Sequence, residues 1–133
     1  MSDETTTPSA ARTTGLVSFS LAVADLDRAR DFYVDVLGFE VRGDREPWPG
    51  ARMIEVAPPG SAIGLVLLPK GSDIPLAVRM TTDDAETAHR VLRGAGAKLH
   101  NKKVLHMGDM PPMFHFDDLD GNGLVYIERT DDA

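Results

Sequence analysis

Alternation of large apolar residues with small or polar ones marks the first element of the chain, over residues 17–23. Val17, Phe19 and Leu21 are large and apolar, whereas Ser18 and Ser20 are small and polar. A period of two residues predicts a β-strand with one covered apolar face and one open face.

The period changes to that of a helix over residues 25–38. Asp25 is placed to cap the first turn, and Gly38 is placed to end the last one. The residues predicted to form the apolar helix face are Leu26, Ala29, Phe32, Tyr33, Val36 and Leu37.

The second half of the chain repeats this order. A strand pattern runs from Leu76 to Met80, and a helix pattern follows over residues 84–96, with His89 expected on its solvated polar side. The offset is 59 residues, from Val17 to Leu76 and from Asp25 to Asp84. The same offset superposes the identical tripeptides at 64–66 and 123–125, so the chain contains an internal repeat.

Further strands are predicted between each helix and the tripeptide that follows it. Each half is therefore expected to be strand, helix, strand, strand, strand, which makes an α+β fold of two βαβββ modules. The predicted strands are 39–44, 51–57 and 62–69 in the first half, and 97–103, 113–116 and 123–128 in the second.

Composition limits the class of protein. The chain has 133 residues, no cysteine and a net charge of −7, so thiolate metal sites and nucleic-acid binding are disfavoured. Residues 1–14 are rich in Thr and Ser and are predicted to be a disordered tail before one domain at 15–130, with modules at about 15–70 and 74–130. Since no segment has the apolar run of a membrane span or a signal peptide, we expect a cytoplasmic protein without membrane contact.

The stretch DLDGNG at 118–123 has the first half of a calcium-loop pattern. The twelfth position from Asp118, where such a loop needs glutamate, is Arg129. Strand-like residues flank the stretch, so we interpret it as a tight turn in which Asp118 and Asp120 accept backbone N–H groups and Gly121 or Asn122 is left-handed.

The run DLDRARDFYVDVLGFE after the first strand, DLDGN before the last strand and the two modules together resemble the vicinal oxygen chelate superfamily over about residues 15–129. This superfamily includes glyoxalase I, bleomycin-resistance proteins, methylmalonyl-CoA epimerase and extradiol dioxygenases. The resemblance implies curved mixed sheets around a cleft, helices on the convex side, and a homodimer.

The resemblance also allows a test for a metal site. Metal-dependent relatives place His, Gln or Glu at four positions, which correspond here to Ser18, Val66, Ala77 and Val125. Valine and alanine have no donor atom, and a neutral serine hydroxyl is a poor ligand. We therefore expect neither the superfamily's metal ion nor another cofactor.

If the superfamily fold holds, strand alternation from these four positions defines the ligand-facing surface. Arg79 is its only cation, and it needs either an anionic or aromatic ligand group or a structural partner such as Glu55; a place at the rim is a further alternative. The residues predicted on this surface are Ser18, Ser20, Val66, Leu68, Ala77, Arg79, Val125 and Ile127.

Loop residues and histidines add further candidates. Trp48 and its repeat equivalent Met107 are expected to offer soft apolar surface to a ligand, together with Met113. The alternative role of the methionines is in a core edge or a dimer interface. His115 is expected either to contact ligand or to occupy a sheet position with a hydrogen bond.

Two functions remain open. The first is a metal-independent binding protein that holds an apolar or aromatic small molecule, such as a drug that it sequesters in antibiotic resistance. The second is a lyase, isomerase or dioxygenase-like enzyme with His115, His106 or Glu55 as the base, or with an atypical metal site at His106, His115 and Asp109.

Overall fold

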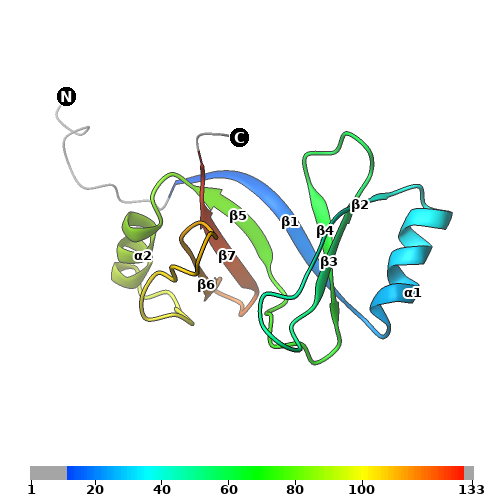
Figure 1. Cartoon of the computed structure of the whole chain (residues 1–133). Coiled ribbons are helices and arrows are strands. Elements are labelled where there is room, and N and C mark those ends of the chain that lie inside the picture. The colour runs from blue at the N-terminus through cyan, green and yellow to red at the C-terminus, as the bar shows by residue number, and fades with distance from the viewer. Residues whose placement is uncertain (1–11, 131–133) are drawn as a thin grey trace. The chain divides into compact units, whose positions relative to one another are not determined.

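The computed structural model describes residues 12–130 and divides them into two compact units (Figure 1). The first unit is Leu16–Arg79. The second unit contains, within the described part of the chain, residues 12–15 and 80–130. Strand β1 (Thr13–Val23) therefore begins in the second unit and ends in the first.

The first unit is a mixed sheet with one helical segment. Its strand order is β2-β3-β4-β1, in which β1 is parallel to β4 and the other neighbours are antiparallel. The elements after β1 are α1 (Leu26–Asp31), a π-helical turn η2 (Phe32–Val36), β2 (Glu40–Arg45), β3 (Met53–Ala57) and β4 (Gly64–Pro69).

The helix α1 begins and ends as its sequence predicts. The Asp25 carboxylate accepts a hydrogen bond from the Arg28 backbone N–H at 3.0 Å, and Gly38 has a φ of 81°, which favours glycine. Only part of the predicted apolar face packs on the β3–β4 core, namely Leu26, Ala29 and Tyr33. The other apolar side chains of this segment, Phe32, Val36 and Leu37, are exposed.

Strand β1 differs from its predicted burial. The serine face is the more enclosed one, since Ser18 is 1% exposed whereas Leu21 is 38% exposed. Ser18 and Ser20 lie beside Gly64 and Val66 of β4, and the Ser20 N–H and hydroxyl both donate to the Ala77 carbonyl. The prediction of an open polar face was therefore wrong, because other parts of the chain cover this face and Ser20 is hydrogen-bonded to Ala77 and Arg79.

In the second unit, a three-strand sheet packs against one longer helix. The strand order is β5-β7-β6, and α2 contacts β6 and β7 (Figure 1). The elements are β5 (Val78–Thr82), whose first two residues belong to the first unit, α2 (Ala85–Gly94), β6 (Met113–Asp117) and β7 (Gly123–Glu128). The buried core comprises Ala85, Ala88, Val104, Phe114, Phe116 and Tyr126.

His89 of α2 belongs to this core and not to the solvated helix side where it was expected. Its side chain is 4% exposed and meets the Phe114 ring edge-on at 4.9 Å. The Arg93 guanidinium can only donate to His89 Nδ1 (3.4 Å), so Nε2 carries the proton and donates to the Asn101 carbonyl at 2.8 Å. Burial is tolerated because both ring nitrogens have partners.

The strand predicted at 97–103 does not form, although this segment runs alongside β6. The His100 N–H donates to the His115 carbonyl at 2.9 Å, as in an antiparallel ladder. The returning bond is lost, because the His115 N–H donates to the Asn101 side-chain oxygen at 2.8 Å. The side chain of Asn101 thus replaces a backbone acceptor and ends the ladder, leaving only isolated bridges.

The DLDGNG stretch is a tight turn between β6 and β7, as predicted, but only Asp118 accepts the backbone N–H groups; Asp120, which was expected to accept them too, donates its own N–H to Asp118. The Asp118 carboxylate accepts the N–H groups of Asp120 and Asn122, both at 2.9 Å, and also the Asn122 side-chain amide. These bonds lower the pKa of Asp118. Gly121 has a φ of 88°, so it takes the left-handed position of the turn.

The N-terminal boundary lies earlier than predicted. Residues 1–11 of the predicted tail fall outside the described residues, but Thr13 and Thr14 belong to β1. Their hydroxyls form hydrogen bonds with those of Tyr126 and Thr81, which draws them into the second unit. The fold class α+β is confirmed. Within residues 12–130, no helix has the length and apolarity to cross a membrane.

Candidate functional site

The face of the first unit that points away from α1 carries several predicted ligand residues. Ser20 lies beside Val66 in the parallel β1–β4 pair, and Glu55 of β3 lies opposite Val66 on its other side. Neighbours in register point to the same face of a sheet. Ser20, Val66 and Glu55 therefore share one face.

Arg79 joins this face through a direct hydrogen bond. Its guanidinium donates to the Ser20 hydroxyl at 2.6 Å, and that hydroxyl donates in turn to the Ala77 carbonyl at 3.1 Å. Burial lowers the pKa of Arg79, and the negative charge of Glu55 partly opposes this shift. Among residues 12–130, Arg79 forms no ion pair.

The Glu55 carboxylate lies over a glycine of the neighbouring strand. A Cβ atom at Gly64 would lie 2.5 Å from Glu55 Oε2, so a side chain there would displace the Glu55 carboxylate. The absence of a side chain at Gly64 thus leaves room for the Glu55 carboxylate to lie across β4. This places a carboxylate and a guanidinium on the same face without joining them as a pair.

Val66 and Leu68 are less accessible than a ligand floor requires. They are 2% and 0% exposed, and they pack with Ala51 and Ile74 in a small core of the first unit. In this structure the chain itself covers these two predicted contact residues. The partly exposed polar groups are Ser20, Glu55 and Arg79.

The corresponding face of the second unit carries the remaining predicted sheet residues. His115 lies opposite Val125, and Met113 lies opposite Ile127, in the antiparallel β6–β7 pair. Val125 is buried, whereas the other three are partly exposed. The predicted loop residues Trp48 and Met107 are 41% and 37% exposed, and Trp48 belongs to the first unit and Met107 to the second.

The metal ion that the superfamily resemblance implies does not fit the residues at its four positions. Ser18 is buried and lies beside Gly64. The side chains of Val66 and Ala77 are apolar, and Val125 lies opposite His115 in the β6–β7 pair. A divalent ion would find one neutral hydroxyl and no imidazole or carboxylate among them. No step of a reaction can therefore be assigned to a metal at these positions.

The atypical metal site suggested by the sequence is not assembled either. His106 approaches Glu86 at 3.4 Å, and Asp109 is exposed in a turn. His115 instead lies with His100 and Asp117, neither of which was a predicted site residue. The alternation of His115 and Asp117 along β6 was a usable signal, but His100 required the pairing of its segment with β6.

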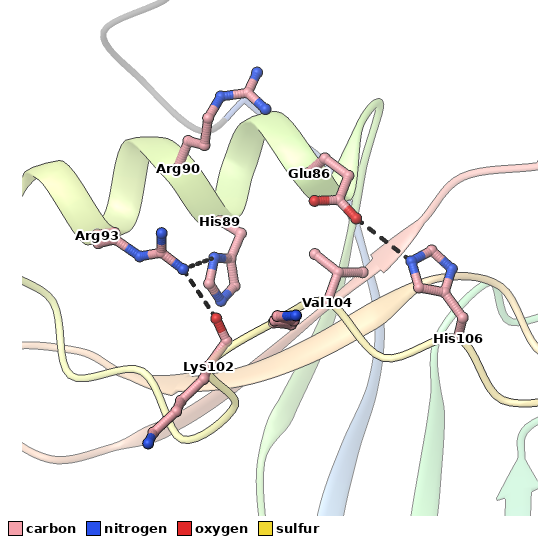
Figure 2. Close-up of a pocket in the computed structure, with 8 residues that line it drawn as sticks. Glu86, His89, Arg90, Arg93, Lys102, Val104 and His106 are labelled. Atoms are coloured by element: carbon pink, nitrogen blue, oxygen red, sulfur yellow. Dashed lines mark hydrogen bonds and ion pairs between the residues drawn. The ribbon is translucent and has the colours of Figure 1, made fainter.

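A pocket in the second unit lies between α2 and the segment that precedes β6 (Figure 2). Its volume is about 470 Å³. Arg93 donates to the Lys102 carbonyl at 2.9 Å, so this cation ties the helix to the segment. The lining residues are Glu86, His89, Arg90, Arg93, Lys102, Lys103, Val104 and His106, which give the pocket a basic character.

Comparisons with known proteins agree with this fold. A methylmalonyl-CoA epimerase structure from Mycobacterium tuberculosis is 23% identical, with a TM-score of 0.76 and coverage of 98% of this chain and 97% of that chain. A hypothetical protein from Bacillus halodurans is 15% identical, with a TM-score of 0.73 and coverage of 89% and 96%. A methylmalonyl-CoA epimerase variant from Streptomyces coelicolor, in complex with 2-nitronate-propionyl-CoA, is 19% identical, with a TM-score of 0.71 and coverage of 89% and 99%.

No curated protein matches the chain. A family model matches residues 15–126, which is most of the sequence. This match accords with the resemblance carried by the helix run and the DLDGN turn. The chain belongs to the Glyoxalase/Bleomycin resistance protein/Dioxygenase superfamily.

Proposed function

We propose that the protein binds an anionic small molecule through Arg79 and Ser20, without a metal ion at the positions that metal-dependent relatives use. The observation that carries this proposal is the state of Arg79. Its guanidinium is desolvated enough to lower its pKa, yet its hydrogen bond goes to the neutral hydroxyl of Ser20.

A ligand carboxylate or phosphate would relieve the cost of this arrangement. A partly buried cation loses hydration and gains most from a bidentate partner of opposite charge. Ser20 holds one edge of the guanidinium, so the other N–H groups have a fixed direction for such a ligand. The rest of the ligand is apolar or aromatic, and sequestration of a drug is one form that this activity can take.

Isothermal titration calorimetry in the presence of EDTA tests the proposal. The probes are acyl-CoAs, including methylmalonyl-CoA, and planar natural products that carry a carboxylate. Each carboxylate probe is compared with its neutral amide or ester. We expect saturable binding of a carboxylate-bearing probe. Since charged hydrogen bonds contribute more than neutral ones, Arg79→Met should weaken binding of that probe by at least about ten-fold.

The matched control is Arg28→Met, which removes an exposed cation of α1 in the same unit. It should leave the affinity unchanged. Equal affinity of wild type and Arg79→Met for every probe, or binding that requires a divalent ion and disappears with EDTA, would contradict the proposal.

Glu55 supports a second candidate function, an enzyme that moves a proton on carbon. Structural neighbours include a methylmalonyl-CoA epimerase in complex with methylmalonyl-CoA. In this chain the Glu55 carboxylate lies across Gly64 on the face shared with Ser20, where Arg79 would hold an acidic group of the substrate. A carboxylate so placed can remove a proton next to a carbonyl and return it.

Deuterium exchange separates the enzyme from the binding protein. In D₂O with EDTA, wild-type protein should catalyse incorporation of deuterium at the α-carbon of methylmalonyl-CoA. Mass spectrometry measures this incorporation over time. Glu55→Gln should reduce the rate by about a hundred-fold or more, because it removes the base. Glu40→Gln, an exposed change on β2, should not alter the rate. Exchange no faster than without protein would reject the enzyme and leave only the binding function.

A further inference from the structure

Two histidines and an aspartate converge on the face of β6 that points away from α2. His115 and Asp117 are two residues apart on this strand, so they share a face. His100 lies opposite His115 on the segment that precedes β6, because its N–H donates to the His115 carbonyl. Within residues 12–130, this is the only group of three or more His, Cys, Asp or Glu residues whose ligand atoms all lie within 4.8 Å of one another.

The three side chains are in direct contact. The imidazole rings of His100 and His115 stack with centroids 4.1 Å apart and planes inclined by 16°. The His100 Nε2 atom lies 2.7 Å from Asp117 Oδ1. The His100 side chain is 34% exposed and that of Asp117 is 13% exposed, so an ion from solvent can reach the group.

We propose that His100, His115 and Asp117 form a binding site for a divalent transition-metal ion such as Zn²⁺. Two neutral imidazoles and one carboxylate are a donor set typical of zinc, cobalt, nickel or iron. At metal–ligand distances of about 2.0–2.2 Å, tetrahedral donors lie roughly 3.3 Å apart. The His100 Nε2 and Asp117 Oδ1 atoms are 2.7 Å apart and all three ligand atoms lie within 4.8 Å of one another, so side-chain rotation that tilts the stacked rings would bring them to this spacing.

The backbone around the group is held on both sides. The Asn101 side chain accepts the His115 N–H at 2.8 Å, and the Asn101 carbonyl accepts the buried His89 Nε2–H at 2.8 Å. The segment that carries His100 is thus fixed to both β6 and α2. Ligands on a supported strand and an anchored neighbouring segment lose little freedom when they bind an ion.

The site is independent of the proposed function. Its residues belong to the second unit, whereas Ser20 and Arg79 belong to the first, and none of the three occupies a position where metal-dependent relatives place a ligand. With three protein ligands, it would leave coordination positions for water or for an oxygen-bearing ligand.

Titration of untagged, EDTA-treated and desalted full-length protein with ZnCl₂ tests the site by calorimetry. We expect one equivalent of Zn²⁺ to bind. Because each variant removes a ligand, His100→Gln, His115→Gln and Asp117→Asn should each lower the affinity by at least about ten-fold. A Co²⁺-loaded sample should show visible absorption of a four- or five-coordinate ion, and the same variants should abolish it.

His106→Gln is the control, because His106 is exposed and pairs with Glu86 outside this group. It should bind Zn²⁺ as wild type does. Circular dichroism of each variant separates loss of a ligand from loss of the fold, and His100→Gln and Asp117→Asn change partly exposed positions that the fold should tolerate. Absence of Zn²⁺ binding by wild type, or equal affinity in folded ligand variants, overturns the proposal. Neither result bears on Arg79, whose test is run in EDTA.

Discussion

Arg79 and His89 are both polar residues withdrawn from solvent, but they use their hydrogen-bonding capacity differently. Both ring nitrogens of His89 have partners, so the residue is a satisfied part of the core. Arg79 has five N–H donors, and Ser20 takes one of them. This contrast assigns a structural role to His89 and leaves Arg79 as the candidate for ligand binding.

The structural role of His89 predicts a large loss of stability on truncation. His89→Ala leaves a cavity beside Phe114 and removes the donor to the Asn101 carbonyl. We expect the free energy of unfolding to fall by about 2–4 kcal/mol, as measured by urea denaturation. The exposed His106→Ala should change it by less than about 0.5 kcal/mol. A change below about 1 kcal/mol for His89→Ala would show that the core does not depend on this ring.

At the scale of elements, both helices begin at an aspartate that lies at equivalent positions of the repeat. Asp84 accepts hydrogen bonds from the N–H groups of Glu86 at 3.0 Å and Thr87 at 3.3 Å, and from the Thr87 hydroxyl at 3.1 Å. The backbone bond from Thr87 is the largest cause that lowers the pKa of Asp84. The cap of α2 therefore stabilises the fold more when Asp84 is ionised than when it is protonated.

The cap of α2 predicts a pH-dependent effect. Asp84→Ala should lower the free energy of unfolding by about 1 kcal/mol at neutral pH. Because the pKa of Asp84 is lowered on folding from its usual 3.8, the contribution is full above that value and is lost as pH falls through the folded-state pKa. Urea denaturation at neutral and strongly acidic pH measures the difference. An unchanged difference at acidic pH, or an equal effect from the exposed Asp73→Ala, would count against the cap.

At the scale of the whole molecule, the repeat determined how much could be predicted. The 59-residue offset located both helices with their aspartate caps, and alternation placed Ser20 and Val66 on one face. The strand predicted at 97–103 does not form, because one side chain, Asn101, replaces a backbone acceptor. His89 was misassigned although it lies four residues after Ala85, on the helix face that is buried.

The candidate sites depended on contacts that one-dimensional patterns do not contain. The bond from Arg79 to Ser20 joins residues 59 positions apart. His100 contacts Asp117 only because the segment that carries His100 runs alongside β6. Sequence patterns gave the faces of strands but not which polar groups would meet across them. Ligand contact by Trp48, Met107 and Met113, the homodimer and the cytoplasmic location stay predictions.

The central claim is that Arg79 recognises an anionic group without a metal ion. The most direct measurement is a calorimetric comparison, in EDTA, of the tightest carboxylate probe and its neutral amide, each titrated into wild type and Arg79→Met. We expect the acid to bind wild type at least about ten-fold more tightly than the amide, and Arg79→Met to remove this preference. Equal preference for the acid in both proteins would contradict it.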